Sequence, residues 1–416
     1  MKVRTLLLAA IALRILIFIV LGPTGSDHHY EVIEAILREH RFPMAEDYAQ
    51  AFHPPAYYVL SLPFAILGGD RLVEFFSLLL SIANVWLLFR LLRDSTHAML
   101  LTALLPQFVI YSILVSNDTL AMLAGTLALL AALGFESDPK PTNAAIAGLV
   151  AALGLLTKGT LIGQAAVLLF VIVVISWRRL PARRALACTA VFIALALLGS
   201  YKYVENQIRY GRPIVHNMDF GPSWVHAQRP TIVGVRSWID VDITKLLREP
   251  YAEKREGGWT NPQSVPLLMF ATLWNHYTPV SNFRGSWTWA PWIARATYLL
   301  AIPATLLILG GWIVGWRKPR AWIPLMFLAA NLAIVLAAGV KYDAWSNFQS
   351  RLLFPAFATI ALGYAWGIEW CRQKSRVLAR CVDVACIALY AAFLIYFAIE
   401  IAFVVSAFIT PRTPAA

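Results

Sequence analysis

Acids, histidines and a pair of prolines gather in one polar interval of this 416-residue chain, directly after its first hydrophobic segment. The interval begins with Gly25-Ser26-Asp27-His28-His29-Tyr30-Glu31 and runs on to His53-Pro54-Pro55-Ala56-Tyr57-Tyr58. Carboxylates and imidazoles are the side chains that most often transfer protons in enzymes. Because most of the remaining chain is apolar, we expect the chemistry of this protein to lie in this interval.

Asp27 is the candidate base of the interval. It follows the first hydrophobic segment, where the chain reaches the boundary between lipid and water. If a helix begins there, Asp27, Glu31 and Glu34 share one face, because residues three and four apart are neighbours on a helix. Glu31 then joins the candidate substrate-binding residues. The alternative is that Ser26 or Asp27 caps the helix and that the acids are solvated.

A metal site is a further alternative for the same residues. His28 and His29, together with Asp27 and Glu31, offer the mixed imidazole and carboxylate ligands that suit zinc or manganese. Loop histidines without fixed geometry are more often solvated. The sequence therefore predicts no cofactor, and a divalent cation (magnesium, manganese or zinc) stays an alternative.

The second half of the interval contains a rigid turn. Two prolines fix the backbone after His53 and leave this residue extended. His53 is then held near the lipid headgroups, where an imidazole can meet a phosphate. Tyr57 and Tyr58 follow as candidate substrate-binding residues. The alternative is an ordinary turn with interfacial aromatic residues.

Three charged residues elsewhere join this group. Lys158 lies between two apolar segments, next to Gly159, and Arg351 opens another segment. Charges at such positions are costly and usually functional, and arginine binds phosphate through two hydrogen bonds at once. Asp118 follows Ser116-Asn117 at the start of a further segment. The alternatives are that Asp118 caps a helix and that the two cations extend toward the interface.

The composition predicts a polytopic α-helical membrane protein. Hydrophobic residues make up 59% of the chain and charged residues 14%, whereas soluble domains carry about 25% charged residues. Apolar runs of roughly 17–25 residues recur, which is the length that crosses a bilayer. The net charge of +12 comes from Lys and Arg between these runs, so it orients the chain in the membrane. We expect no nucleic-acid partner.

Eleven spans are predicted, and a twelfth apolar stretch, 54–69, is ambiguous. If this stretch crosses the membrane, the basic runs 178–184, 317–320 and 372–380 fall on the outside, against the positive-inside rule. If it lies along the interface or re-enters on the same side, all three runs are cytoplasmic. We therefore expect it to be interfacial. The predicted spans are 5–22, 71–92, 97–115, 119–135, 142–157, 159–177, 184–202, 292–315, 321–339, 352–370 and 382–409.

This topology places the N-terminus in the cytoplasm and all candidate site residues on the outer face. It divides the chain into an N-terminal transmembrane module (1–202), a polar outer region (203–291) and C-terminal transmembrane helices (292–416). The first outer loop, 23–70, contains the interfacial helices. The outer region is rich in Trp, Tyr, His and Arg, which favours a soluble lid at the membrane surface.

Five short motifs follow one another along nearly the whole chain. They are Asp27 with Tyr30, His53-Pro54-Pro55 with Tyr57-Tyr58, Ser116-Asn117-Asp118-Thr119-Leu120, Gly154-Leu155-Leu156-Thr157-Lys158-Gly159 and Gln349-Ser350-Arg351-Leu352-Leu353-Phe354-Pro355. In their order, and in their common position on the outer side of the membrane, these motifs resemble those of the GT-C glycosyltransferases, specifically the protein O-mannosyltransferase and aminoarabinose-transferase-like group. The segment Arg209-Tyr210-Gly211-Arg212-Pro213 resembles the start of the large outer loop of that group.

The resemblance implies a role for each motif. Asp27 would be the catalytic base, and Lys158 and Arg351 would lie near the phosphate of a lipid-linked donor. Asp118 would shape the site. The residue before Pro54-Pro55 would contact the donor phosphate; it is often Lys in the aminoarabinose branch and is His53 here. The family frequently has a second acid after the first aspartate, where this chain has His28, which argues against a typical protein mannosyltransferase.

The predicted function is that of an inverting membrane glycosyltransferase in the inner or plasma membrane. It transfers a monosaccharide from a polyprenyl-phosphate donor to an acceptor hydroxyl on a glycan, lipid or protein at the outer face. Such transfer needs a base, fixed cations for the departing phosphate and both substrates held in line. The alternatives are a lipid or sugar transporter or flippase, and an O-antigen ligase or polymerase. The sugar, the acceptor, the length of the lipid carrier and the oligomeric state are not predicted.

Overall fold

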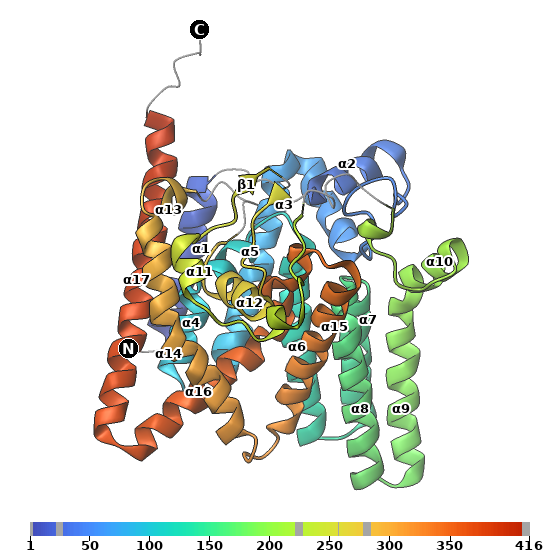
Figure 1. The fold of residues 1–416 in the computed structure, drawn as a ribbon. Coiled ribbons are helices and arrows are strands. Elements are labelled where there is room, and N and C mark those ends of the chain that lie inside the picture. Colours follow the sequence, from blue (N-terminus) through green and yellow to red (C-terminus); the bar gives the residue numbers. More distant parts are fainter. Residues whose placement is uncertain (1–2, 22–27, 221–227, 257, 278–283, 410–416) are drawn as a thin grey trace.

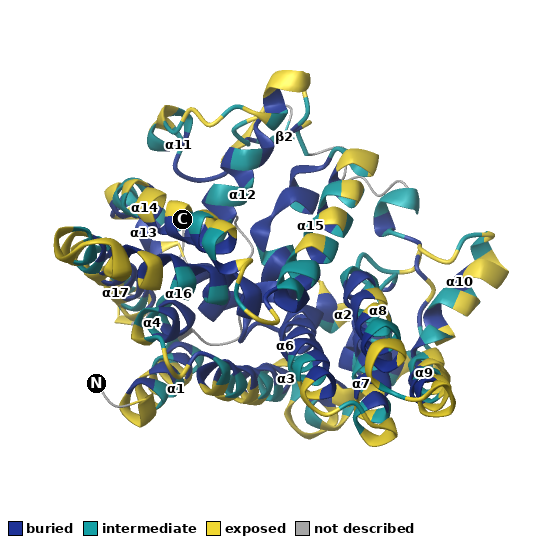
Figure 2. Cartoon of the chain, turned by 90° about the horizontal axis from the view of Figure 1, so that it is seen from below, coloured by how far each residue is buried: buried dark blue, intermediate teal, exposed yellow. Residues whose placement is uncertain are grey.

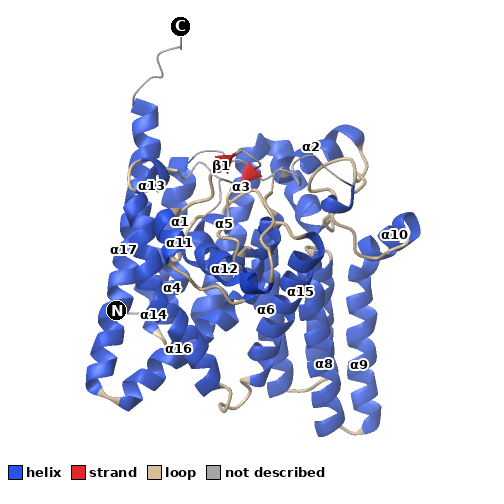
Figure 3. Ribbon diagram, viewed as in Figure 1, coloured by secondary structure: helices blue, strands red, loops and turns tan. Residues whose placement is uncertain are grey.

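The computed structural model describes residues 3–21, 28–220, 228–256, 258–277 and 284–409. Asp27, the candidate base, lies outside the described residues. The described chain is helical almost throughout, and its one hairpin joins β1 (Lys254–Arg255) to β2 (Gly258–Trp259) in antiparallel register (Figure 3).

Nine helical segments of the described chain are long and apolar enough to cross a membrane, so the chain is an integral membrane protein. The predicted spans 97–115 and 142–157 form shorter helices, so the total of eleven crossings stays a prediction. The helices of the bundle are α1 (Val3–Leu21), α3 (Ala56–Leu91), α4 (Thr96–Leu104), α5 (Pro106–Tyr111), α6 (Asn117–Ser137), α7 (Pro141–Leu155), α8 (Ile162–Arg179), α9 (Ala182–Ala196), α14 (Pro291–Gly315), α15 (Trp322–Tyr342), α16 (Phe357–Lys374) and α17 (Arg376–Ile409).

Several short helices lie at one end of this bundle, and others lie beside its middle. Figure 1 shows α2, β1 and α13 at that end, and α10 leaving the end of α9 sideways. The outer region is not only a surface lid, because α12 is apolar, contains the fully buried Trp274 and packs against α5 and α14. The short helices are α2 (His29–Glu39), α10 (Tyr201–Tyr210), α11 (Thr244–Arg248), α12 (Val265–Trp274) and α13 (Gly285–Thr288).

The ambiguous stretch 54–69 forms a helix of its own, which a sharp kink separates from the next span. It is the first half of α3, and Gly68 and Gly69 leave the helical conformation at the kink. Gly69 has φ 64°, which a residue with a Cβ rarely adopts. The first half of α3 packs through Tyr57 and Tyr58 against the apolar face of α2. The two helices predicted for the first outer loop are therefore present, and their location in the membrane interface stays a prediction.

The predicted span 97–115 is broken at Pro106 into α4 and α5. Proline has no N–H, so the carbonyl four residues earlier loses its helical partner. Arg14 of α1 replaces that partner, because its guanidinium donates to Thr102 O at 3.2 Å and to Ala103 O at 3.4 Å. Arg14 is fully buried and also donates to Ser81 Oγ at 3.0 Å. This intramembrane charge therefore faces the bundle interior and holds three helices together.

The basic turns predicted to be cytoplasmic meet at one end of the bundle. Glu136, at the end of α6, pairs with Arg179 of α8 and with Arg320 of the α14–α15 turn. Asp383 of α17 pairs with Arg372 of α16 and His97 of α4. In Figure 1 the turns between α8 and α9 and between α16 and α17 lie opposite α2. This common end agrees with the charge argument, and the compartment that it faces stays a prediction.

The bundle is closed by tight helix packing. A Cβ added at Gly311 of α14 would lie 1.8 Å from the carbonyl oxygen of Gly363 of α16, so only glycine allows this contact. Figure 2 shows buried residues toward the interior and exposed residues on the outer faces of α9, α14 and α17. Many of these exposed residues are large and apolar, for example Leu306 and Ile313, as expected for faces that contact lipid.

Candidate active site

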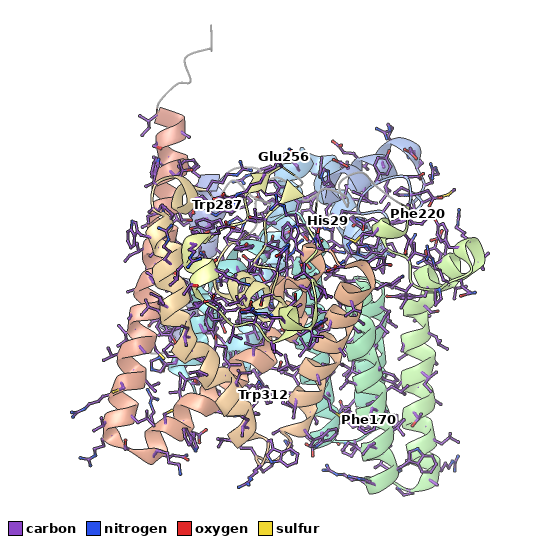
Figure 4. The ribbon with its side chains drawn as sticks, in the orientation of Figure 1. His29, Phe170, Phe220, Glu256, Trp287 and Trp312 are labelled. Carbon is purple, nitrogen blue, oxygen red and sulfur yellow. The ribbon has the colours of Figure 1, made fainter. Side chains whose placement is uncertain are left out.

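A cavity of about 680 Å³ lies at the end of the bundle opposite the basic turns. His53, Asp118, Lys158 and Arg351 all line it, although they come from four distant parts of the sequence. His29 lies on the same wall; Figure 4 labels it near that end of the molecule, away from Phe170 and Trp312. Apart from Asp27, which lies outside the described residues, the structure thus brings together four of the charged or ionisable positions that the sequence singles out.

Asp118 is not the cap of its helix. The capping residue of α6 is Ser116, whose Oγ accepts the N–H of Asp118 at 3.2 Å. The Asp118 carboxylate is therefore available to the cavity, where it hydrogen-bonds the ammonium of Lys158 and lies 3.6 Å from Nη1 of Arg351. The side chains of Asp118 and Lys158 are 3% and 8% exposed, so this pair is buried.

The chain segment around Lys158 positions both Lys158 and His53. Lys158 has an extended backbone just before a short 3₁₀ helix, Gly159–Leu161, and Asn117 Nδ2 donates to the preceding Thr157 O at 3.4 Å. The Pro54-Pro55 turn rests on the same segment, because the N–H of Ala56 donates to Leu156 O at 2.7 Å. The motifs around residues 53 and 158 therefore form one structural unit.

Residues of the outer region hold the segment that carries Arg351 in place. It lies in the 3₁₀ helix Ser350–Ala356, and Ser350 donates from N to Thr272 Oγ1 at 2.8 Å and from Oγ to Met269 O at 2.6 Å. Both partners belong to α12. The guanidinium carbon of Arg351 lies 4.6 Å from the ring centroid of Tyr111, a cation–π contact that fixes its plane.

His53 is an uncharged member of the wall. Burial lowers its pKa well below the ordinary value, and the charge of Lys158 lowers it further. His53 can thus contribute hydrogen bonds at neutral pH, while charge for an anion must come from other residues.

Four of the other sequence-predicted residues lie away from the wall. Tyr57 and Tyr58 are fully buried behind it; Tyr57 pairs with Ser77, and the Tyr58 hydroxyl lies 2.9 Å from His29 Nδ1. Tyr58 thus supports His29. His28 and Glu31 are exposed, pair with each other at 2.7 Å and do not line the cavity.

The N-terminus of α2 explains the position of Glu31. The helix begins at His29 rather than at Asp27, after His28 in a left-handed conformation with φ 64°. His29, Val32, Ile33 and Ile36 form the buried face, so Glu31 points the other way. Within the described residues no group of three His, Cys, Asp or Glu side chains is arranged to hold a metal ion.

Several wall residues were not found from the sequence. Lys202 and Lys341 line the cavity, and their position just after a span on the side where Lys is disfavoured is the same signal that singled out Lys158. His216 and Tyr342 also line it. His216 lies in the outer region, where its residue type allows substrate binding or no role at all, and no periodic pattern there places it at the site.

Asp219 organises this second set of residues. Its carboxylate accepts the N–H of His216 at 2.9 Å and the Tyr342 hydroxyl at 3.0 Å. It also lies 3.5 Å from Nζ of Lys341 and 3.3 Å from Nη1 of Arg212. Burial alone would raise the pKa of Asp219, but the hydrogen bonds and cations outweigh it and lower the pKa. The ionised Asp219 thus connects the outer region to the end of α15.

The wall carries more positive than negative charge. Asp118 is the single carboxylate among the described wall residues, and the cations are Lys158, Lys202, Lys341 and Arg351. Apolar side chains of α8 and α15 such as Ile162, Ile334 and Ala338 form another part of the wall. This combination suits a ligand with a phosphate and an apolar portion.

Known proteins resemble the chain in part of the sequence and in the fold. The family model of the dolichyl-phosphate-mannose-protein mannosyltransferases matches residues 52–201. No curated protein matches the chain in sequence.

Solved structures of membrane transferases superpose on nearly the whole chain. The oligosaccharyltransferase of Archaeoglobus fulgidus in its apo form has a TM-score of 0.51 at 14% identity, over 99% of this chain and 58% of its own. With a tethered acceptor peptide the same enzyme gives 0.50 at 13% identity, over 96% and 55%. ArnT of Cupriavidus metallidurans bound to undecaprenyl phosphate gives 0.48 at 11%, over 96% and 76%.

The chain spans just over half the length of the archaeal enzyme, and at these identities the likeness is one of fold. The arrangement of helices and the family model over residues 52–201 agree with the resemblance predicted from the sequence motifs. The chain therefore has the fold of the GT-C membrane glycosyltransferases.

Proposed function

We propose that this protein is a membrane glycosyltransferase that moves a monosaccharide from a polyprenyl-phosphate donor to an acceptor hydroxyl at the outer face of the membrane. The observation that carries the proposal is the cavity, whose wall collects Lys158, Arg351, Asp118 and His53 from four separate motifs. The family model that matches residues 52–201 is named for a donor of this class, a dolichyl-phosphate sugar.

Lys158 and Arg351 are proposed to bind the donor phosphate. Asp118 faces both cations and fixes their positions before substrate arrives. Pre-positioned charges of this kind stabilise negative charge that develops on a leaving group, because they need no rearrangement during the reaction. As the bond from the anomeric carbon to the phosphate oxygen breaks, the electron pair goes to the phosphate between these two side chains.

Asp27 is proposed as the general base. It would accept the proton of the acceptor hydroxyl while the acceptor oxygen attacks the anomeric carbon from the side opposite the phosphate, which inverts the configuration. Asp27 precedes His29, a residue of the cavity wall, by two positions, and this supports the assignment. The apolar side chains of α8 and α15 offer a surface for the first isoprene units of the lipid.

The test uses the purified full-length protein in lipid nanodiscs and a panel of radiolabelled polyprenyl-phosphate monosaccharides. Donor binding and transfer, or slow release of the sugar to water, are measured for the wild type, Asp27→Asn and Glu34→Gln. Glu34 is the matched control, because it is an exposed carboxylate of the neighbouring helix α2 away from the cavity. We expect Asp27→Asn to bind donor and lose turnover, and Glu34→Gln to retain both.

Two results would contradict parts of the proposal. Equal turnover in the wild type and Asp27→Asn would place the base elsewhere. Absence of binding to every lipid-phosphate sugar would refute the glycosyltransferase assignment and favour a transporter.

A further inference from the structure

Five aromatic or imidazole rings form a continuous row along one side of the cavity. The ring centroids of His29 and His53 are 5.7 Å apart, those of His53 and Phe52 3.9 Å, those of Phe52 and His216 4.6 Å, and those of His216 and Tyr342 4.8 Å. All five residues line the cavity. We call them the ring row.

The ring row is assembled from distant segments and fixed at both ends. His29 at one end lies 2.9 Å from the Tyr58 hydroxyl, and Tyr342 at the other end donates to Asp219. Between the ends, Asn217 Nδ2 donates to Ala49 O at 2.9 Å and joins the two loops that carry Phe52 and His216. Side chains held in this way present a preformed surface to a ligand.

The chemistry of the ring row differs from that of the cations beside it. Burial lowers the pKa of His53, and burial lowers the pKa of His216 to about 4, so both imidazoles are neutral at pH 7. Neutral imidazoles and aromatic rings bind a phosphate weakly. Their faces attract the polarised C–H groups of a sugar, and their nitrogen and hydroxyl groups hydrogen-bond its hydroxyls.

We propose that the ring row binds the sugar of the donor, while Lys158 and Arg351 bind its phosphate. This inference rests on the proposed function and adds the class of sugar, which is a neutral monosaccharide. The ring row itself carries no carboxylate. Asp118, the single carboxylate of the described wall, already faces two cations, and Asp219 behind the row faces Lys341 and Arg212, so the row favours a neutral sugar over a positively charged amino sugar. Phe52 and His216, at the centre of the row, set the specificity.

The experiment compares three ligands: polyprenyl phosphate alone, the same lipid carrying a neutral hexose, and the same lipid carrying an amino pentose. Affinities are measured by calorimetry or fluorescence titration in nanodiscs for the wild type, Phe52→Leu, His216→Leu, Lys158→Met and Phe170→Leu. Phe170 is the matched control, an aromatic residue of α8 that lies away from the cavity (Figure 4). Two separate variants of the ring row keep the test informative if one of them fails to fold.

The expected pattern separates the two subsites. Each variant of the ring row weakens binding of the sugar-bearing lipid by about tenfold and leaves polyprenyl phosphate within about twofold. Lys158→Met weakens binding of all three ligands, and Phe170→Leu weakens binding of none. In the wild type the lipid with a neutral hexose binds more tightly than one with an amino pentose.

Each opposite result has its own meaning. Equal loss for polyprenyl phosphate and the hexose lipid, or no loss for either, in the variants of the ring row would overturn the sugar site while the proposed function stands. Tighter binding of the amino pentose lipid would overturn the neutral-sugar assignment. If the wild type binds none of the three lipids, the proposed function fails and the ring row fails with it.

Discussion

Helix α6 carries an aspartate–lysine pair at each of its ends, and the two pairs have opposite environments. At its N-terminal end Asp118 pairs with Lys158, with side chains 3% and 8% exposed. At its C-terminal end Asp138 pairs with Lys140, with side chains 58% and 52% exposed. Two pairs of the same chemical type are thus buried beside a cavity at one end of the bundle and solvated at the other.

The difference shows which charges are candidates for function. An exposed pair contributes about 0–1 kcal/mol and needs no special explanation beyond orienting the chain. A buried pair loses solvation that its own attraction rarely recovers in full, so its presence indicates another role. Asp118 is a candidate for such a role, because Arg351 lies 3.6 Å from it and the cavity opens beside the pair.

Neutralising each lysine in turn is the strongest test of this comparison. We expect Lys158→Met to lower the rate of sugar transfer by about 100-fold or more, because it removes a fixed cation from the leaving phosphate and leaves Asp118 less compensated. Lys140→Met should retain the rate within about twofold, since its pair is solvated. Initial rates with saturating donor measure both. Similar rates for the two variants would show that the burial of an aspartate–lysine pair does not indicate whether its lysine is needed for sugar transfer.

Glu136 is the exception at the basic end, because its side chain is 5% exposed and clamps Arg179 and Arg320. We expect Glu136→Gln to lower the free energy of unfolding by about 1 kcal/mol, since both arginines are half-exposed and screened by solvent. Transfer activity at low temperature should remain. Thermal unfolding in detergent and the initial rate are measured on the same sample, and a loss of activity without a loss of stability would argue against a purely structural clamp.

The sequence was sufficient for the charged part of the candidate site. Lys158 and Arg351 stand out because cations at the outer ends of spans are costly, and His53 because two prolines follow it. The fold class followed from apolar runs alone. The kink in α3 and the break at Pro106 also had sequence signals, Gly68-Gly69 and a proline within an apolar run.

The remaining parts depend on tertiary contacts that no local pattern encodes. His216 reaches the cavity through Asp219 and Asn217, which bond it to α15 and to the loop after α2. Glu31 lies away from the cavity because His29, Val32 and Ile33 take the buried face of α2, and the sequence does not show which face of α2 meets the cavity. Asp27 lies outside the described residues, so its role as the base stays a prediction.

As the pH falls, the cavity end of the bundle should lose stability before the end that carries the basic turns. The pKa of His216 is lowered to about 4 by burial, against about 6.5 in an unfolded chain, while Lys341 and Lys158 lower it further and Asp219 opposes them. Between these values the unfolded state binds a proton that the folded state does not, so stability falls as the pH falls.

The unfolding temperature, followed from pH 7 to 4, should therefore decrease less steeply in His216→Gln than in the wild type. Hydrogen exchange locates the change, and we expect early opening of the loop at residues 42–55 rather than of the α8–α9 turn. Identical slopes for the two proteins would exclude His216 as the titrating group.

The smallest effect is expected at α10, which extends the cavity end toward the lipid. Val204 and Ile208 on its outer face are 52% and 79% exposed, whereas Lys202 and Asn206 on its inner face line the cavity. An exposed apolar face that continues from a span is stabilised by the lipid interface. A charge in Ile208→Asp should loosen that contact and shift the inner face, which we expect to lower the transfer rate by about threefold. The effect is small because Ile208 is mostly exposed, so the substitution removes much less burial free energy than the loss of a fully buried Ile side chain would. Gln207→Asp adds the same charge at a neighbouring exposed position and should have no effect; an equal loss in both variants would mean that charge near the cavity, rather than contact with lipid, controls α10.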